Sequence, residues 1–181
     1  MKVERSSIAD VLLLEPEVFG DARGFFFESY NRRAFARETG IDVEFVQDNH
    51  SRSSKNVLRG LHYQLRQPQG KLVRVTAGEI WDVAVDLRRG SPSFGRWAAA
   101  TLSAESRRML WVPAGFAHGF LVLSEHAEVL YKTTDYYAPE HERSLLWNDP
   151  ALAIAWPLAG EPVMTDKDRR GTPLASAETY A

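Results

Sequence analysis

Residues 56–75 read NVLRGLHYQLRQPQGKLVRV, which sets one histidine and several cations among apolar residues that alternate as in a β-strand. Strand alternation predicts that Leu58 and His62 share one face of this strand, with Arg59 and Tyr63 on the other. A histidine among buried neighbours raises the question of its protonation state. The stretch is therefore the first candidate for chemistry in the chain.

Composition predicts one globular domain over residues 1–181, with 44% hydrophobic residues and no cysteine. The lack of cysteine excludes disulfides, zinc–thiolate sites and thiol catalysis. A net charge of −2 argues against a nucleic acid polymer as the partner and favours a small ligand. The N-terminus has no apolar signal region, and no run of ~18 apolar residues occurs, so we expect no membrane association and a cytoplasmic location.

The central part of the chain consists of short apolar and aromatic runs separated by Gly and Pro, which is typical of a mainly β sandwich or barrel. The runs that predict strands are Val43–Gln47, Val57–Tyr63, Leu72–Thr76, Ile80–Leu87, Ala98–Leu102, Arg107–Val112, Gly119–Leu123 and Glu128–Thr134.

Turn and helix signals lie between these runs. Residues 77–79, Ala-Gly-Glu, predict a tight hairpin, and a turn at residues 19–24 is expected between the first two strands. One helix is predicted, with Asn31 as its N-cap and Gly40 just past its end. The segment 139–181 is rich in Pro and Gly and is expected to wrap the barrel. Its charged cluster at 166–170, taken by charge alone, is typical of a solvated loop.

Residues 111–120, WVPAGFAHGF, contain the pattern P-x-G-x-x-H between two apolar runs, which resembles the second motif of the cupin superfamily. This resemblance implies a double-sheet jelly-roll barrel with His118 delivered into its mouth. Metal-binding cupins supply an H-x-H pair in their first motif, whereas here His62 is followed by Tyr63 and Gln64. We therefore expect no metal, although a metal-dependent cupin enzyme stays as a rival hypothesis.

A barrel without metal can use histidine as a general base. A neutral imidazole can remove a proton from a carbon next to a carbonyl when a carboxylate orients it and a cation stabilises the enolate. The chain contains all these residue types around His62 and His118, so proton transfer at carbon is a hypothesis that the residues themselves support.

Several motifs together resemble the dTDP-4-dehydrorhamnose 3,5-epimerase family over nearly the whole chain. They are RGLHYQ at 59–64, the strand of Lys71, VPAGFAHGF at 112–120, YKTTDYYAPE at 131–140, LWNDP at 146–150 and Lys-Asp at 167–168, with DARGFFFE at 21–28 and FVQDN at 45–49 in agreement.

The resemblance implies a role for each matching residue. His62 is the expected general base and Asp168 holds it in orientation, so the late charged loop would fold back over the site. Tyr131 matches the general acid and Lys71 the residue that stabilises the enolate oxygen. The expected substrate-binding residues are Phe19, Arg23, Glu28, Gln47, Asn49, Arg59, His118, Tyr137, Glu142 and Lys167. Tyr137 falls where an aromatic ring stacks on the thymine base in the family, with the neighbouring Tyr136 as the alternative, and Phe19 is expected to help cover the base.

The resemblance also implies a reaction. The expected substrate is dTDP-4-dehydro-6-deoxy-D-glucose, which is epimerised at C3 and C5 to dTDP-4-dehydro-L-rhamnose in dTDP-L-rhamnose biosynthesis, without a cofactor. Epimerisation of only C3 or C5, for a secondary-metabolite pathway, is the nearest rival, and a non-catalytic sugar-binding cupin is a third. A homodimer is expected, and exchange of an N-terminal strand between subunits would protect an exposed sheet edge.

Overall fold

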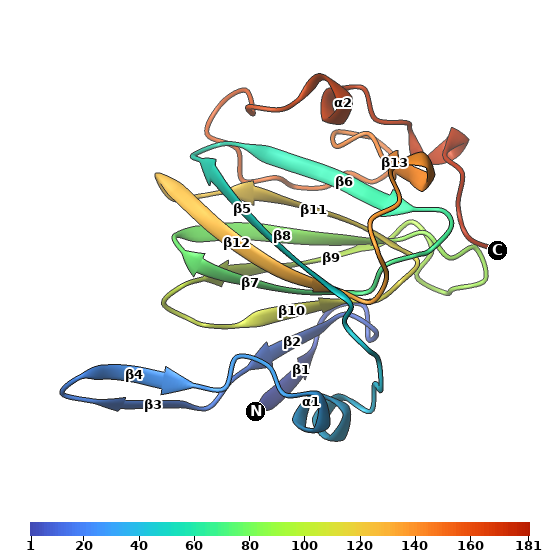
Figure 1. The fold of residues 1–181 in the computed structure, drawn as a ribbon. Helices are drawn as coiled ribbons and strands as arrows, with labels where there is room; N and C mark the ends of the chain where they lie inside the picture. The colour runs from blue at the N-terminus through green and yellow to red at the C-terminus, as the bar shows by residue number, and fades with distance from the viewer.

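The computed structural model describes residues 1–181, and its strands form two sheets that face each other, with a separate two-stranded hairpin (Figure 1). The strands are β1 (Lys2–Arg5), β2 (Leu12–Glu15), β3 (Val18–Asp21), β4 (Gly24–Phe27), β5 (Gln47–Ser54), β6 (Leu58–Gln64), β7 (Lys71–Ala77), β8 (Glu79–Asp86), β9 (Trp97–Ser103), β10 (Met109–Val112), β11 (Phe116–Val122), β12 (His126–Thr133) and β13 (Glu142–Ser144). The helices are α1 (Arg32–Thr39) and α2 (Asp166–Arg169), with 3₁₀ turns at Pro139–His141 and Leu174–Ser176.

The sheets confirm the predicted mainly β, double-sheet jelly-roll barrel. One sheet has the order β1-β2-β10-β7-β12-β5 and the other β13-β6-β11-β8-β9. All pairs of neighbouring strands are antiparallel. From β5 to β13 the chain changes sheet at every step except between β8 and β9, which pair with each other. The inner faces of both sheets therefore enclose one interior.

Most of that interior is an apolar core. Inward-facing side chains of both sheets, together with the loop after β1, form a cluster of Ile8, Val11, Val73, Val75, Ile80, Ala84, Ala98, Leu102, Leu110, Val112, Phe116, Phe120, Val122, Ala127 and Val129. Burying each of the larger members contributes about 1.5–3 kcal/mol. This core fixes the spacing between the sheets, and the polar residues of the site occupy the rest of the barrel.

Two smaller clusters cover the outer faces of the sheets. Helix α1 places Phe35 against Leu14, Met109 and Trp111 on the six-stranded sheet. Its predicted ends are confirmed, because Asn31 accepts a hydrogen bond from Ala34 N at 3.1 Å and Gly40 has a φ of 75°. On the five-stranded sheet, residues after Ser144 pack Leu145, Leu152, Trp156 and Ala177 over the strands, as expected of the C-terminal segment.

Two strand predictions are wrong. The run Val43–Gln47 is not a strand, and the neighbouring strand is instead the polar segment β5, which begins at Gln47. The turn at 77–79 does not close a hairpin, because β7 and β8 belong to different sheets. Gly78 has a φ of 73° there and lets the chain pass from one sheet to the other. A tight turn signal in the sequence fixes a reversal of direction but not the pairing of its flanking strands.

The hairpin of β3 and β4 extends away from the barrel beyond β2 (Figure 1). All of its residues except Phe27 are exposed, including Phe19, Phe25 and Phe26. The sequence predicted a turn here between two strands, and the structure adds β3 and the edge strand β1. No helix of the structure is long and apolar enough to cross a membrane.

Candidate active site

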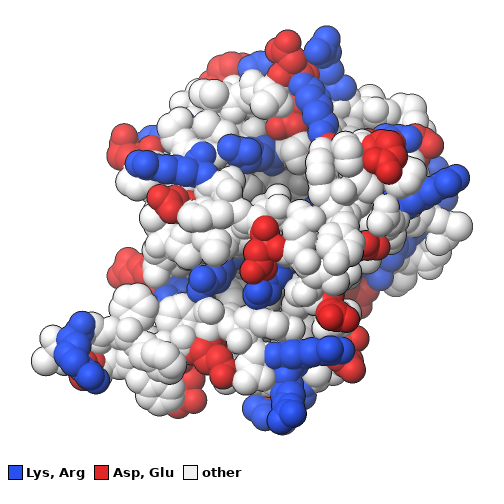
Figure 2. Space-filling view, in the orientation of Figure 1, with Lys and Arg blue, Asp and Glu red and all other residues white.

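A cavity of about 330 Å³ opens between the two sheets, and a hollow is visible in the upper half of the face in Figure 2. Its walls come from both sheets and from the loop before β13. It is lined by Gln47, Asn49, Ser51, Arg59, His62, Tyr63, Gln64, Gln69, Lys71, His118, Gly119, Phe120, Tyr131, Tyr137 and Glu142. Nine of these are residues that the sequence assigned to catalysis or substrate binding.

The strands β6 and β11 depart from regular pairing where they enter the cavity. Gly60 has a φ of 105°, and the register between the strands shifts between His118 and Phe120. A Cβ at Gly60 would lie 2.6 Å from the backbone oxygen of His118, so only glycine permits this approach.

This irregularity changes which side chains share a face. Arg59 and His62 both line the cavity, whereas Leu58 and Leu61 both pack outward under the C-terminal segment. The prediction from strict alternation, which put Arg59 and His62 on opposite faces, is therefore wrong. The cause is the bulge, which moves two polar side chains to the same side of the strand.

His62 forms a short bond to a buried carboxylate. Its Nε2 lies 2.5 Å from Oδ1 of Asp168, which is the only buried residue of α2. Burial would raise the pKa of Asp168, but the bond to His62 and further hydrogen bonds outweigh burial and lower it. An ionised Asp168 holds the imidazole in one orientation and stabilises its protonated form.

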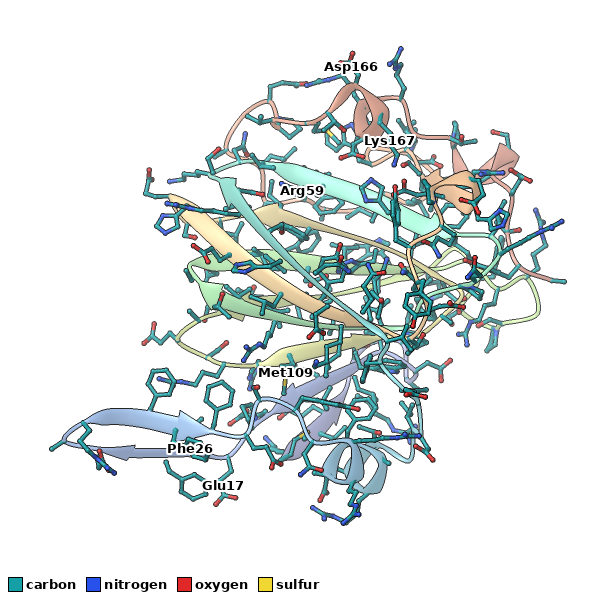
Figure 3. The ribbon with its side chains drawn as sticks, in the orientation of Figure 1. Glu17, Phe26, Arg59, Met109, Asp166 and Lys167 are labelled. Carbon is teal, nitrogen blue, oxygen red and sulfur yellow. The ribbon has the colours of Figure 1, made fainter.

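Helix α2 is short but firmly capped. The side chain of Thr165 accepts a hydrogen bond from Asp168 N at 3.2 Å. Asp166 lies at the outer edge of the molecule, whereas Lys167 lies between α2 and the body of the protein (Figure 3). The description of this loop as merely solvated therefore holds for Asp166 and is wrong for Asp168.

Tyr131 and Lys71 reach the cavity from the opposite sheet, on β12 and β7. Burial raises the pKa of Tyr131, against the nearby charge of Arg59, so its hydroxyl keeps its proton at neutral pH. Burial lowers the pKa of Lys71 to about 8, while Glu142 and Asp82 oppose this change. At neutral pH the cavity therefore holds a phenol able to donate a proton and an ammonium group able to stabilise an anion.

A cluster of polar groups forms the mouth of the cavity. The hydroxyl of Tyr137 donates to Glu142 at 2.9 Å, and Lys167 forms an ion pair with the same carboxylate. Gln47 accepts from Tyr137 N and donates to Asn49. Tyr136 does not line the cavity and is 60% exposed, so the aromatic ring at the mouth is that of Tyr137.

Arg59 and His118 are the remaining predicted site residues that line the cavity. Arg59 Nε donates to Ser53 Oγ at 2.9 Å, which orients the guanidinium group along the cavity wall. His118 is the cross-strand partner of His62 and lies 2.6 Å from Asp82 Oδ1. It is thus beside the candidate base.

Five predicted residues do not line this cavity: Asp168 and Lys167 bind its lining residues His62 and Glu142, whereas the other three lie apart from it. Phe19 and Arg23 belong to the exposed hairpin, where Arg23 pairs with Asp21, and Glu28 follows β4 and accepts from Asn31. A single chain therefore does not bring them to His62.

Other cavity residues were not predicted. Ser51, Gln64, Gln69 and Phe120 line it, and the buried Asp82 lies beneath it. Ser51 carries a usable signal, because it continues the alternation of Gln47 and Asn49 along a polar strand. Asp82 could have been noticed as an acidic residue between the apolar residues Trp81 and Val83 of the predicted strand Ile80–Leu87.

The arrangement places a histidine–aspartate pair on one wall and a protonated tyrosine on the other. Such a site can remove a proton from one side of a bound molecule and return one to the other side. No group of three or more histidine, cysteine or acidic side chains is arranged to hold a metal ion.

Comparison with known proteins gives consistent matches. The sequence profile of the dTDP-4-dehydrorhamnose 3,5-epimerase family matches residues 5–176. The dTDP-4-dehydrorhamnose 3,5-epimerase of Pseudomonas aeruginosa is 65% identical over 180 residues, covering 99% of each chain. The structure of dTDP-6-deoxy-D-glucose-3,5-epimerase from Legionella pneumophila, in complex with dTDP-4-keto-L-rhamnose, matches with a TM-score of 0.96 and 50% identity, covering 98% of this chain and 94% of that one. A 3'-monoepimerase from Streptomyces bikiniensis, in complex with dTDP-quinovose, matches with a TM-score of 0.88 and 35% identity, covering 94% and 87%.

Proposed function

Because the chain belongs to the dTDP-4-dehydrorhamnose 3,5-epimerase family, we propose that its cavity performs the family's isomerisation through a base and an acid held on opposite sheets. The protein is an isomerase that converts dTDP-4-dehydro-6-deoxy-D-glucose to dTDP-4-dehydro-L-rhamnose. The observation that carries the proposed mechanism is the position of His62 and Tyr131 on facing walls.

The base of the proposed mechanism is His62. The hydrogens at C3 and C5 of the substrate flank the same carbonyl at C4 and, in the D-gluco ring, lie on the same face. One imidazole can therefore reach both, while Asp168 stabilises the imidazolium that each proton removal creates. Tyr131 then protonates the carbon from the opposite face, which inverts the configuration.

Lys71 stabilises the anion between these two steps. Removal of either proton moves negative charge to the oxygen at C4, so one enolate site serves both carbons. Lys71 is 7% exposed, and a buried ammonium group interacts with such an anion more strongly than one in water. It performs this role only while it is protonated.

The nucleotide is bound at the mouth of the cavity. Tyr137 offers a ring for stacking on thymine, with Gln47 and Asn49 beside it. Arg59 and Lys167 supply positive charge for the pyrophosphate, and a guanidinium group suits bidentate contact with it.

Proton NMR of the substrate in D₂O tests this function directly. We expect the C3 and C5 signals both to disappear as the enzyme exchanges these hydrogens with solvent. Loss of one signal alone would instead support a single-carbon epimerase, like the 3'-monoepimerase from Streptomyces bikiniensis. Retention of both signals would overturn the proposed mechanism.

Substitution of the base separates chemistry from binding. His62→Ala should reduce exchange at both carbons by about 10²–10⁴-fold, the usual contribution of a positioned general base. Affinity for dTDP should stay close to that of the native protein, because the proposed contacts with the nucleotide are made by other residues, namely Tyr137, Gln47, Asn49, Arg59 and Lys167. Calorimetry with dTDP provides the control, and turnover by His62→Ala at the native rate would exclude it as the base.

We also propose a homodimer in which the β3–β4 hairpin of one chain completes the site of the other. The hairpin exposes Phe19, Phe25 and Phe26, and large exposed aromatic side chains are typical of an interaction surface. It also carries Arg23, which is far from the cavity of its own chain. An exchanged hairpin would cover the apolar side chains and supply Phe19 and Arg23 to the bound nucleotide.

We also propose that the protein is located in the cytoplasm. The chain has no cysteine, so its fold needs no oxidising compartment to form disulfides. Fractionation of cells followed by detection with a specific antibody would test it.

A further inference from the structure

The turn between β6 and β7 binds the segment that carries Tyr137. Residues 64–69 read QLRQPQ, and we call them the glutamine turn. The chain contains only one other glutamine, Gln47. The side chains of all four glutamines form hydrogen bonds to residues 135–138. The glutamine turn and this segment lie at the same end of the barrel (Figure 1).

Gln64 binds the backbone of the segment on both sides of Tyr137. Its Nε2 donates to Tyr136 O at 3.2 Å, and its Oε1 accepts from Ala138 N at 2.9 Å. The same Nε2 donates to Gln67 O at 2.8 Å within the glutamine turn. Both N–H groups of the amide are therefore used, and the side chain keeps no donor for a ligand. Gln64 is 3% exposed, so these bonds are shielded from water.

The rest of the glutamine turn binds the start of the same segment. Gln69 Nε2 donates to Asp135 O at 2.9 Å, and Gln67 Nε2 donates to Asp135 Oδ1 at 3.3 Å. Gln67 has a φ of 53°, which is unfavourable for a residue other than glycine, and its carbonyl oxygen accepts the bond from Gln64. The turn thus keeps an unfavourable backbone conformation while its side chains bind residues 135–138.

The conformation of Tyr136 and Tyr137 depends on these side chains. Neither residue belongs to a helix or strand, and neither forms a hydrogen bond with another backbone group. Tyr137 N donates instead to Gln47 Oε1 at 3.0 Å. The backbone around the ring at the cavity mouth is therefore held by glutamine amides from both sheets.

We propose that Gln64 is a positioning residue, which holds the segment 135–138 so that the ring of Tyr137 is in place before the nucleotide binds. The inference rests on the proposed function, in which this ring stacks on thymine. A ring that is already in its bound position does not have to be ordered by the ligand, so no affinity is lost to ordering. Gln64 follows His62 by two residues on β6, so one strand positions both the candidate base and the ring for the nucleotide.

The substitution Gln64→Met tests this role because it keeps the length of the side chain but removes its hydrogen bonds. We expect the Kd of dTDP to rise by about 2–10-fold, the cost of ordering a loose aromatic side chain on binding. The value of kcat should stay native, because Gln64 bonds neither His62 nor Tyr131. Calorimetry with dTDP and steady-state kinetics measure the two effects.

A double-mutant cycle distinguishes positioning of Tyr137 from a general loss of stability. Tyr137→Ala alone should weaken dTDP binding by about tenfold, since it removes the stacking ring. Adding Gln64→Met to Tyr137→Ala should cause no further loss, because Gln64 acts through that ring. An equal loss in both backgrounds, or no loss from Gln64→Met in the native background, would overturn the proposal.

Asp149→Leu is a matched control. Asp149 is 5% exposed, and its carboxylate accepts from Ala151 N and Leu174 N, so it also holds a loop through backbone groups. It belongs to the C-terminal segment and does not line the cavity. This variant should lower the melting temperature while the Kd of dTDP stays native. A rise in Kd equal to that of Gln64→Met would contradict the role of Gln64.

The proposal can be tested even when Gln64→Met does not fold. In the native protein without nucleotide, the N–H groups of Tyr137 and Ala138 should exchange slowly with D₂O, because glutamine side chains accept from both. Fast exchange of both groups would show a loose segment and overturn the inference. Failure of the proposed function is recognised separately, because the native protein would then bind no dTDP and exchange neither C3 nor C5 hydrogen. Native binding and turnover with equal losses in the two backgrounds contradict only the role of Gln64.

Discussion

The proposed catalytic side chains of this barrel differ in how burial and neighbouring charges affect them. His62 is 31% exposed toward the cavity, while its partner Asp168 is 5% exposed behind it. The proposed base is therefore open to a ligand, and the carboxylate proposed to orient it is protected from solvent. Tyr131 and Lys71 show the two opposite effects of burial, which keeps a phenol protonated but favours loss of a proton from an ammonium group.

Tyr131→Phe should separate proton removal from inversion. The variant keeps His62, so exchange of the C3 and C5 hydrogens should continue at a rate within about tenfold of the native one. Formation of the inverted product should fall by about 10²–10⁴-fold, because the opposite-face donor is lost. NMR in D₂O measures both rates in one sample.

Tyr136→Phe is the matched control for that experiment, since Tyr136 lies outside the cavity and is exposed. It should leave both rates unchanged. Equal losses of exchange and inversion in Tyr131→Phe would show instead that Tyr131 positions the substrate.

The pH dependence of the native enzyme should report Lys71. Its folded pKa is lowered to about 8, so the protonated form is lost as pH rises through that value, and kcat/KM should fall with it. Lys71→Arg should remove this fall, because a guanidinium group stays charged over the whole range. Lys132→Arg, on the outer face of β12, should keep the native profile. A fall near pH 8 that persists in Lys71→Arg would assign it to another group.

At the scale of elements, α2 is four residues long and holds both Asp168 and Lys167. Thr165→Ala removes its N-cap and should destabilise it by about 1 kcal/mol. We expect kcat to fall several-fold and KM to rise, since the orienting carboxylate and a nucleotide-binding cation loosen together. Steady-state kinetics measures both effects.

Thr39→Ala is the corresponding control at the end of α1. The Thr39 hydroxyl bonds Phe35 O and Ile41 N, far from the cavity. This variant should lower the free energy of unfolding by a similar amount without changing kcat or KM. An equal kinetic effect from Thr39→Ala would indicate that general loss of stability, not α2, is responsible.

The elements also show which features the sequence could predict. Apolar alternation located β7, β8, β9 and β12 to within a residue or two of their ends, because one face of each is buried in the barrel. It did not locate β5, whose inward residues Gln47, Asn49, Ser51 and Ser53 face the cavity and its wall. A strand that lines a polar site lacks the hydrophobic pattern of a strand in a core.

The residues of the candidate site were likewise predicted only in part. Motifs indicated His62 and Tyr131, and the structure places them on facing walls. They did not indicate the bulge at Gly60, because a single glycine in a strand does not specify a φ of 105°. Asp82 was missed because the sequence does not show that β8 pairs with β11, which brings its carboxylate to His118.

At the scale of the whole molecule, the hairpin of β3 and β4 is the part that a single chain leaves without a function. Its one contact of note with the body is the guanidinium of Arg107, which lies 4.1 Å from the ring centroid of Phe25. This contact leaves Phe19, Phe26 and Arg23 exposed. In the proposed homodimer, the second copy of the chain would cover these exposed side chains.

Mixing two impaired chains tests the exchanged hairpin. One chain carries His62→Ala, and the other carries Phe19→Ala with Arg23→Ala. In a hybrid dimer, one site receives all the substitutions and the other receives none, if each hairpin serves its partner. Unfolding and refolding an equal mixture should make half of the dimers hybrids and restore about one quarter of the native activity. When each hairpin serves its own chain, every site in the mixture keeps a defect and activity stays at the sum of the parents, which would reject the exchange.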